Sequence, residues 1–477
     1  MKKFEKKREA VTEEGEKGQR LKVPVKASAA YTGASVIAKV AGLCFTPLFT
    51  RAMSGAEYGS YALYMTVVGL ITTLCGSIFT GSVMYRGYSL FQGNERRFTA
   101  SAAILYFIFS GVTWILLLPL SIRVGVKGDF LPFLLLQILA DAAIAVFFAE
   151  KRYFYSYRSA VLVTVISSIG GPLISLGLLR IISGAYSRVL GLLIASLAVA
   201  LPFLLKRLKE GAYDREMWKY LCGCALPLLP GAVCHGIIAE ADKLAIGRFM
   251  GREALAAYAV AHSIGVGLTF ITGSLGSALF PWMMRKLKKG DLREMRGTVS
   301  IIFASLSALT VVLVGAAPEA LALLSPRSYS AALPSVLPLA LATLPSFLTS
   351  LLGVLMLHRD KPQRQSATLI VSGVLNALLN VLLVPRFEYF GAGLALLVSF
   401  VASAALGYYL SRDEINEYIS FPDILRSCTY TVLLSALMTV LYPYPALRIL
   451  LFTVPAVNLI SAAYKMKSLV FERAQSV

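Results

Sequence analysis

The sequence predicts an all-α polytopic membrane protein with about 14 transmembrane helices, arranged as two parallel six-helix lobes followed by two C-terminal helices. Three observations predict this class: 57% of the residues are apolar, basic residues alternate between successive loops, and the two halves of the chain resemble each other. The apolar runs are close to the roughly 20 residues that a helix needs to cross a bilayer. The spans are expected to begin near residues 27, 58, 98, 130, 159, 188, 220, 255, 298, 331, 365, 391, 423 and 446.

Lys and Arg gather in alternate loops. Of the 46 Lys and Arg, 34 lie in the two tails and in the loops after the even-numbered spans, and 10 lie in the other loops. Only Lys39 and Lys243 fall inside spans. The positive-inside rule therefore predicts that both termini are cytoplasmic. The net charge of +20 reflects this topology, and no nucleic-acid partner is expected, because the basic residues are not gathered into one domain.

The expected spans and tails divide the chain into five segments. These are a disordered basic cytoplasmic tail (1–26), an N-lobe of six helices (27–210), a C-lobe of six helices (211–412), two further helices (413–464) and a second cytoplasmic tail (465–477). The first tail is rich in Lys, Arg and Glu, and its few apolar residues cannot bury a core. The six cysteines are expected to be free thiols: Cys44, Cys75, Cys222, Cys224, Cys234 and Cys428.

An internal repeat predicts the two-lobe arrangement. An offset of 197 residues aligns Arg51 with Arg248 and Tyr61 with Tyr258. Six helices separate the copies, and an even number returns the chain to the same side of the membrane. The halves are therefore expected to be parallel repeats that face each other across a central cavity, as in several transporter folds.

Three stretches carry a family resemblance. They are KVAGLCFTPLFTRAMSGAEYGSY (39–61), DKLAIGRFMGREALAAY (242–258) and NALLNVLLVPRFEYFGAGLA (376–395). In this order they resemble the bacterial oligosaccharide flippase (polysaccharide export) family, which belongs to the multidrug/oligosaccharidyl-lipid/polysaccharide exporter superfamily. The resemblance covers roughly residues 27–410. It implies a multi-pass protein of the bacterial plasma membrane that is not an enzyme.

The resemblance also implies a function in surface polysaccharide biosynthesis. The protein would move an undecaprenyl-pyrophosphate-linked oligosaccharide from the inner to the outer leaflet by alternating access, with membrane lipid around it and polysaccharide polymerase machinery as a further partner. The sequence contains no Walker A glycine loop, so an ion gradient, the membrane potential or removal of product is the expected energy source. No cofactor or metal site is expected.

Lys39 is the first candidate for substrate binding. It lies about 12 residues into the first span, where an unpaired charge costs about 2.5 to 3.5 kcal/mol on insertion scales. A pyrophosphate is a suitable transient partner for its ammonium group. His235 is the second candidate, because the repeat register places it at a similar depth in the other lobe. The alternative for Lys39 is a lysine that snorkels or pairs with Asp141.

Basic residues at the inner ends of the spans could capture the headgroup first. Arg86 and Arg152 are the candidates, with Arg158 beside them. Ordinary inside-positive anchoring explains these residues equally well.

The seventh span has the densest set of charged residues. Glu240 and Lys243 are spaced as an i, i+3 pair that can neutralise itself. With Asp242 they are expected to serve gating or structure near the outer mouth, and direct contact with substrate or an ion is the alternative. Pro227 and Pro230 are expected to break the start of this helix.

Two further residues are candidates for coupling or gating. Asp141 is a lone acid near the middle of the fourth span and could couple transport to protons or sodium. His262 lies one turn after Tyr258 and has an imidazole, which ordinarily titrates near neutral pH. A hydrogen-bonded packing role is the alternative for both residues.

Two features concern helix packing. Asn376 and Asn380, one turn apart, are expected to hydrogen-bond between helices. Gly170, Gly171 and Pro172 are expected to mark a bend.

Two rival functions stay open. An ion-coupled multidrug exporter of the same fold would have a cavity rich in carboxylates in place of Lys39. A membrane glycosyltransferase or polymerase would need catalytic groups on a substantial external loop, and every expected external loop is short.

Overall fold

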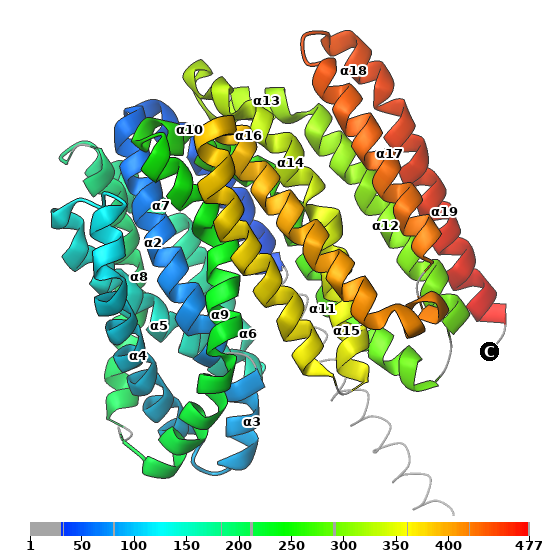
Figure 1. Ribbon diagram of the computed structural model, residues 1–477. Helices are drawn as coiled ribbons and strands as arrows, with labels where there is room; N and C mark the ends of the chain where they lie inside the picture. The colour runs from blue at the N-terminus through cyan, green and yellow to red at the C-terminus, as the bar shows by residue number, and fades with distance from the viewer. Residues whose placement is uncertain are drawn as a thin grey trace, which may run out of the picture. The chain divides into compact units, whose positions relative to one another are not determined.

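The computed structural model describes residues 30–31, 33–79, 82–182, 184–209, 213–289, 292–359, 361–418 and 420–475, and all regular elements in these ranges are helices (Figure 1). This confirms the predicted all-α class. The expected tail over 1–26 lies outside the described residues. The chain divides into two compact units, each with its own internal packing. Unit 1 comprises the residues up to Phe49 with Ile71–Leu229, and unit 2 comprises Thr50–Leu70 with Pro230–Val477.

Unit 1 contains the first seven spans of the chain, without the part of α2 before Ile71 and the part of α9 after Leu229. Its helices are Gly33–Ala52, α2 (Gly55–Phe79), α3 (Ser82–Leu90), α4 (Glu95–Arg123), α5 (Leu131–Tyr153), α6 (Tyr157–Val165), α7 (Gly171–Leu178), α8 (Ala185–Leu208) and the start of α9 (Arg215–Phe249). Small residues allow close packing between these helices. Gly191 of α8 lies so close to Ser175 of α7 that a side chain at Gly191 would overlap it.

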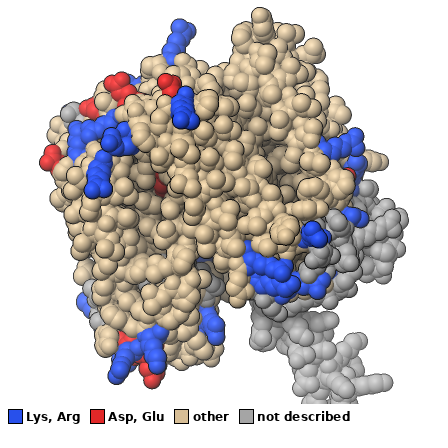
Figure 2. All heavy atoms as spheres, viewed as in Figure 1, with Lys and Arg blue, Asp and Glu red and all other residues tan. Residues whose placement is uncertain are grey.

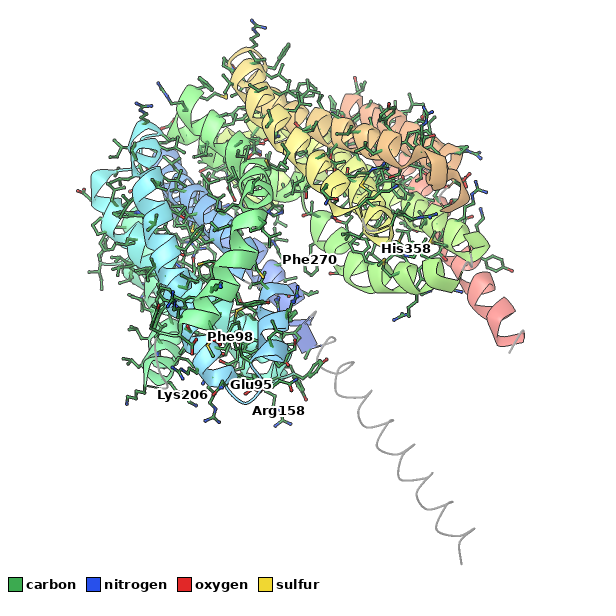
Figure 3. All side chains as sticks on the ribbon, turned by 60° about the horizontal axis from the view of Figure 1, so that its bottom comes forward. Glu95, Phe98, Arg158, Lys206, Phe270 and His358 are labelled. Carbon is green, nitrogen blue, oxygen red and sulfur yellow. The ribbon has the colours of Figure 1, made fainter. Side chains whose placement is uncertain are left out.

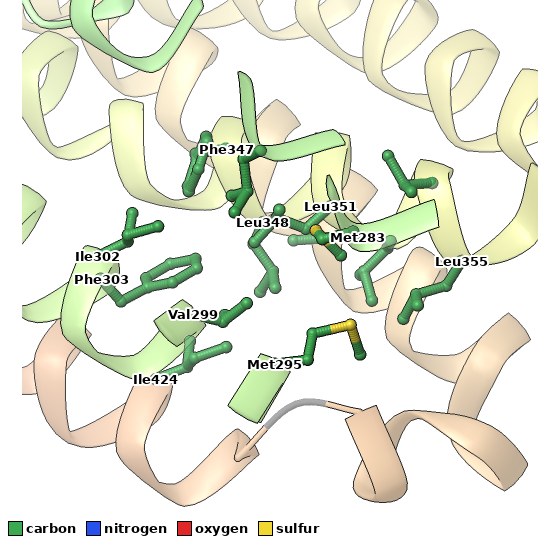
Figure 4. Packing of buried hydrophobic residues seen from close by; sticks show 14 of the residues in the cluster. Met283, Met295, Val299, Ile302, Phe303, Phe347, Leu348, Leu351, Leu355 and Ile424 are labelled. Carbon is green, nitrogen blue, oxygen red and sulfur yellow. The ribbon is translucent and has the colours of Figure 1, made fainter. Parts of the chain in front are cut away.

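Unit 2 holds the remaining helices. They are the part of α2 up to Leu70, the rest of α9, α10 (Arg252–Gly265), α11 (Thr269–Lys289), α12 (Leu292–Gly315), α13 (Ala317–Leu324), α14 (Val336–Leu341), α15 (Thr343–His358), α16 (Pro362–Tyr418), α17 (Phe421–Val440), α18 (Pro445–Leu451) and α19 (Thr453–Gln475). α17 and α19 both pack on α12 (Figure 1). A cluster of buried apolar side chains from α11, α12, α15, α16 and α17, including Phe303 and Phe347, forms a core (Figure 4).

The outer faces of the helices are apolar, as lipid contact requires. Leu116 of α4, for example, is 72% exposed. A helix that is hydrophobic on all sides belongs in a membrane, where no water-facing stripe is needed. Over unit 1, Lys and Arg gather at the top and bottom of the view in Figure 2, and the band between carries almost none.

The described residues contain 11 helices that are long and apolar enough to cross a membrane, or up to 12 if one bent pair is a single span. The chain is thus a multi-span membrane protein, but the predicted total of 14 is not confirmed. Gln363–Arg412 counts once, although two spans were expected there. Glu388 has φ 49° and ψ −128°, which are not helical values, so α16 consists of two limbs joined at a sharp turn. α17 was also expected to span the membrane and is not among the 11 helices.

The eighth span is bent, although a continuous helix was expected from residue 255. α10 ends at Gly265, and α11 starts at Thr269 at an angle of 42°. Gly265 is the last residue of α10, and Gly267 lies between the two helices. Glycine tolerates such a change of direction at low steric cost. The bend turns the α11 residues that follow it toward a cavity described below.

Two other expected irregularities have different outcomes. Pro227 and Pro230 do not end α9, which runs as one helix of 35 residues, so the expected break is wrong. The boundary between the two units nevertheless falls at Pro230. The bend expected at Gly170 corresponds to a π-helical turn over Ile166–Gly170, which widens the helix before α7 begins.

The predicted repeat register is kept by the helix boundaries. α2 begins at Gly55 and α10 begins at Arg252, which are 197 residues apart. In each copy a short break after the preceding helix leads into the next helix. The division into lobes at 210 and 412 remains a prediction.

Candidate functional site

A polar cluster joins α9 to α10 in unit 2. It comprises Glu240, Asp242, Lys243, Tyr258 and His262. The Tyr258 hydroxyl donates to Asp242 Oδ2 over 2.6 Å, and His262 Nε2 lies 3.3 Å from the same oxygen. Asp242 Oδ1 accepts the backbone N–H of Lys243 over 2.7 Å. Asp242 is 1% exposed and Tyr258 is 0% exposed, so these bonds are shielded from solvent.

The second half of the polar cluster is an ion pair. Lys243 Nζ lies 2.7 Å from Glu240 Oε2, which confirms the contact that the i, i+3 spacing predicted. Lys243 Nζ also donates to the carbonyl of Ala239, one turn earlier, over 3.2 Å. Glu240 reaches α2, where a side chain at Gly69 would collide with its carboxylate. The absence of a side chain at Gly69 therefore makes room for Glu240.

The polar cluster satisfies its charges internally. Each carboxylate has a donor within hydrogen-bond distance, and this is what buried polar groups require. Sequence reasoning treated His262 apart from the α9 residues, whereas the structure places it on Asp242. Across the described residues, no group of three or more His, Cys, Asp or Glu side chains could hold a metal ion.

His235 lies elsewhere on α9, at a cavity that we call the hydroxyl cavity. The cavity has a volume of about 410 Å³ and lies within unit 2. Most of its polar side chains carry hydroxyl groups, and its apolar walls include three phenylalanines. The lining residues are His235, Ile238, Thr269, Thr272, Gly273, Gly276, Phe280, Ser346, Phe347, Thr349, Ser350, Gln365, Ser366, Thr368, Leu369 and Phe400.

Close packing of α9 on α16 positions one wall of the hydroxyl cavity. A side chain at Gly373 would lie 2.7 Å from Cys234 Cβ, so glycine allows α16 to approach α9 at this point. His235 follows Cys234 directly and thereby lies near the α16 residues Gln365 and Thr368. α11, which begins directly after the bend, supplies another wall.

The hydroxyl groups of the cavity bond to their own helices. Thr272 donates to the carbonyl of Thr269 over 3.0 Å, and Thr349 donates to the carbonyl of Pro345 over 2.9 Å. Their oxygens keep free lone pairs. The side chains of His235 and Gln365 have no recorded hydrogen-bond partner among the described residues. Unlike the polar cluster, the cavity therefore keeps unused hydrogen-bonding capacity.

Lys39 and Asp141 lie in unit 1 and do not pair with each other. Lys39 is exposed in the helix Gly33–Ala52 and has no recorded partner in the described part of the chain. Asp141 accepts a 2.9 Å hydrogen bond from Gln137 Nε2, which also bonds to Ser196 of α8. The structure thus gives no support to the alternative in which Lys39 pairs with Asp141. Instead, the Gln137 amide links Asp141 of α5 to Ser196 of α8.

The basic candidates of unit 1 are exposed. Arg86, Arg152 and Arg158 all have exposed side chains, and Arg152 also stacks over the Tyr31 ring at 5.9 Å. Sequence reasoning missed an ion pair nearby, in which Arg207 Nη2 lies 2.7 Å from Glu150 Oε1.

The Glu150 ion pair borders a charged cavity at one end of unit 1. This cavity has a volume of about 430 Å³, and its lining residues are Glu95, Arg96, Glu150, Lys151, Phe154, Ser156, Lys206 and Arg207. Figure 3 shows Glu95, Lys206 and Arg158 at this end. The basic residues that line this cavity are Arg96, Lys151, Lys206 and Arg207, and none of the three sequence-predicted arginines is among its lining residues.

The two asparagines of α16 do not bond between helices. Asn380 Nδ2 donates to the backbone carbonyl of Asn376 over 2.9 Å and to its side-chain oxygen over 3.2 Å. Both residues are buried, and their recorded bonds stay within one helix turn. The prediction of an interhelical bond is therefore wrong for the described residues. The i, i+4 spacing lets the Asn380 amide donate to Asn376, while Asn376 Nδ2 and Asn380 Oδ1 are buried there without a hydrogen-bond partner.

Comparisons with known proteins agree with this architecture. A family model described as "Polysaccharide biosynthesis protein" matches residues 48–323. The probable low-salt glycan biosynthesis flippase Agl15 of Haloferax volcanii is 22% identical over 395 residues, which are 78% of this chain and 80% of the relative.

Solved structures share the fold over most of the chain. The lipid II flippase MurJ in an inward closed conformation has a TM-score of 0.63 at 13% identity, and the match covers 93% of this chain and 99% of MurJ. An inward-facing multidrug resistance MATE family transporter of the MOP superfamily has a TM-score of 0.61 at 16% identity, with 83% and 98% covered. The helices of this chain therefore adopt the fold of these transporters.

Proposed function

The chain belongs to the polysaccharide biosynthesis protein family, and we propose that it is a flippase for a lipid-linked oligosaccharide. The substrate would be carried on undecaprenyl pyrophosphate and would move from the inner to the outer leaflet by alternating access. The relatives named above are flippases and transporters, which agrees with a protein that is not an enzyme.

Lys39 is the observation that carries this proposal. An ammonium group in a membrane-spanning helix is costly unless it meets water or an anion, and Lys39 has no recorded partner in the described part of the chain. A pyrophosphate concentrates negative charge and would neutralise the lysine during transport. The prenyl tail of such a substrate would remain in lipid.

The other candidate residues have roles in the same scheme. Arg86 and Arg152 would capture the pyrophosphate from the inner leaflet, because both are exposed and basic. His235 would contact the substrate from the hydroxyl cavity. These three residues and Lys39 form the proposed substrate-binding set.

Gating and coupling are assigned to the charged residues of the spans. Glu240, Asp242, Lys243 and His262 would serve gating: the Asp242–His262 contact would resist separation of α9 and α10 during transport, and the Glu240–Lys243 pair lies beside it within α9. Asp141 would be the coupling acid, because among the described residues its carboxylate is recorded to bond only to the neutral side chain of Gln137. A single amide leaves the carboxyl able to exchange a proton or an ion.

We assign the protein to the bacterial plasma (inner) membrane with both termini cytoplasmic. The uneven distribution of Lys and Arg over the loops supports this orientation. Polysaccharide polymerase machinery would use the product on the outer side.

A multidrug exporter is the second candidate, because the MATE transporter has a similar fold. A drug exporter for organic cations has no need of a cationic group such as Lys39. The two candidates therefore differ in their response to the variant Lys39→Gln.

The experiment measures translocation of a fluorescent undecaprenyl-pyrophosphate oligosaccharide in proteoliposomes. Wild type is compared with Lys39→Gln, with and without an imposed pH or sodium gradient. We expect a loss of about tenfold or more in the variant, because a charge-assisted contact is worth about 1.5 to 3 kcal/mol. Lys219→Gln, at an exposed position of α9, is the control and should behave as wild type. Normal flipping by Lys39→Gln, or drug uptake without flipping, would contradict the proposal.

A further inference from the structure

The hydroxyl cavity has the chemistry of a sugar-binding site. We propose that it binds an uncharged sugar of the lipid-linked substrate, which is an inference that rests on the proposed function. Its volume of about 410 Å³ is within the roughly 300–1,000 Å³ range of small-molecule sites. Four helices of unit 2 supply its walls.

The first argument is hydrogen-bond complementarity. Thr272, Thr349 and Ser350 each direct the hydroxyl hydrogen to a carbonyl of their own helix. The lone pairs of these hydroxyls remain as acceptors beside the cavity. Gln365 and His235 add side chains that can both donate and accept, and neither side chain has a recorded hydrogen-bond partner in the described ranges. A ligand that carries many hydroxyl groups would use all of these positions.

The second argument is the shape and rigidity of the apolar walls. Phe280, Phe347 and Phe400 come from three different helices and line the cavity. Phe347 is 2% exposed and packs in the core with Phe303, so its ring is held in place. Sugars have an apolar face of C–H groups and a polar rim of hydroxyls, and this lining offers surfaces for both.

The third argument is the lack of charge. The described residues that line the cavity include no Asp, Glu, Lys or Arg. A carboxylate or phosphate placed there would lose its hydration without gaining a counter-ion, which is costly. The cavity is therefore suited to an uncharged sugar, and the pyrophosphate would be bound by basic residues elsewhere.

A prenyl chain is a poorer occupant for the same cavity. It would cover the side chains of Gln365 and His235 without offering hydrogen bonds to them, and buried polar groups without partners are destabilising. The experiment below includes this occupant as an outcome.

The test uses the full chain in lipid nanodiscs and three probes. The probes are undecaprenyl pyrophosphate alone, the same carrier with N-acetylglucosamine, and the same carrier with glucuronic acid. Native mass spectrometry gives the dissociation constant of each. The double variant Thr272→Val/Thr349→Val removes two hydroxyls at nearly constant volume. Thr439→Val is the matched control, because Thr439 bonds to a carbonyl of its own helix α17 outside the cavity.

We expect the double variant to bind the N-acetylglucosamine carrier about tenfold more weakly than wild type, because two hydrogen bonds are lost. Its binding of the sugar-free carrier should not change, and neither should any binding by Thr439→Val. Wild type should bind the glucuronic acid carrier at least about tenfold more weakly than the N-acetylglucosamine carrier. If the double variant does not fold, Gln365→Leu takes its place. This variant changes a different wall of the cavity and should show the same sugar-dependent loss of binding.

Three results would overturn the inference. Equal binding of all carriers by wild type and variant would show that the hydroxyls do not contact the sugar. Equal weakening with and without sugar would assign the cavity to the carrier chain. Equal affinity of wild type for the glucuronic acid and N-acetylglucosamine carriers would show that the cavity does not discriminate against a charged sugar.

The failure of this inference is distinguishable from that of the proposed function. If wild type translocates the fluorescent substrate and the variants bind sugar normally, only the cavity assignment fails. If wild type does not translocate it but sugar-dependent binding is lost in the variants, the flippase proposal fails and the sugar site remains.

Discussion

The polar cluster and the hydroxyl cavity lie on the same helix, α9, and use hydrogen bonds in opposite ways. In the polar cluster, Asp242 and Glu240 are charged residues whose partners are protein groups. In the hydroxyl cavity, His235 is joined by neutral side chains that border open space and keep bonding capacity. The difference teaches that the densest group of charges in α9 is not where hydrogen-bonding capacity stays open. Satisfied charges stabilise the fold, and unsatisfied neutral groups are available to a ligand.

Asp242→Ala should have the largest effect on stability. It leaves the buried Tyr258 hydroxyl without its acceptor and removes one partner of His262. We expect a loss of about 2–4 kcal/mol, since unsatisfied buried polar groups and broken networks give the large values among point mutants. Thermal unfolding in detergent measures the change, with the exposed Glu216→Ala as control. Equal melting temperatures for the two variants would contradict a stabilising polar cluster.

Lys243→Met should have the next largest effect. It leaves Glu240 without its ion-pair partner in a partly buried position, and we expect a loss of about 1–3 kcal/mol. The double variant Glu240→Gln/Lys243→Met should recover part of this loss, because no unpaired charge remains. A double-mutant cycle on unfolding measures the coupling between the two residues. Additive losses would mean that the 2.7 Å contact contributes nothing.

Glu319 and Arg448 make a charged pair that is less shielded, and its effect should be smaller. Arg448 Nη1 donates to Glu319 Oε2 over 2.9 Å and links α18 to α13. This hydrogen bond lowers the pKa of Glu319. The pair should therefore contribute stability above the pKa of the unfolded Glu319, and this contribution should be lost as the pH falls through the lower pKa of the folded protein.

The pH dependence of unfolding tests this pair. The Glu319 side chain is 59% exposed, so Glu319→Gln should cost less than about 1 kcal/mol near neutral pH. The difference from wild type should shrink as the solution is acidified. A difference that stays constant down to a pH below the folded pKa would contradict the assignment.

Thr272→Val/Thr349→Val should have the smallest effect on stability. Both hydroxyls bond to carbonyls within their own helices and hold no other element in place. We expect a change within about 0.5 kcal/mol. A loss as large as that of Asp242→Ala would make the hydroxyl cavity a packing feature, and it would remove the distinction between the two regions.

The sequence was sufficient for features that depend on local spacing. The Glu240–Lys243 contact follows from an i, i+3 separation on a helix, and the structure has it. The 197-residue repeat register matches the starts of α2 and α10. These features require only helix geometry and a periodic apolar pattern, both of which are visible in one chain.

Features that depend on tertiary packing were not predicted. The bend after Gly265 was missed because glycine occurs within continuous membrane helices as well as at breaks. Tyr258 and His262 share a helix face by their spacing, but only the packing of α10 on α9 brings Asp242 to them. The hydroxyl cavity draws on four helices, and its serines and threonines resemble those that bond to their own backbone in any membrane helix.

The most direct test of the account is the rate at which proteoliposomes translocate undecaprenyl pyrophosphate carrying N-acetylglucosamine, for wild type and Thr272→Val/Thr349→Val. Rates are divided by the amount of folded protein, and melting temperatures are measured on the same samples. The account predicts rapid translocation by wild type and a rate about tenfold lower for the variant, with equal melting temperatures. Equal rates for the two proteins, or no translocation by wild type, would contradict it.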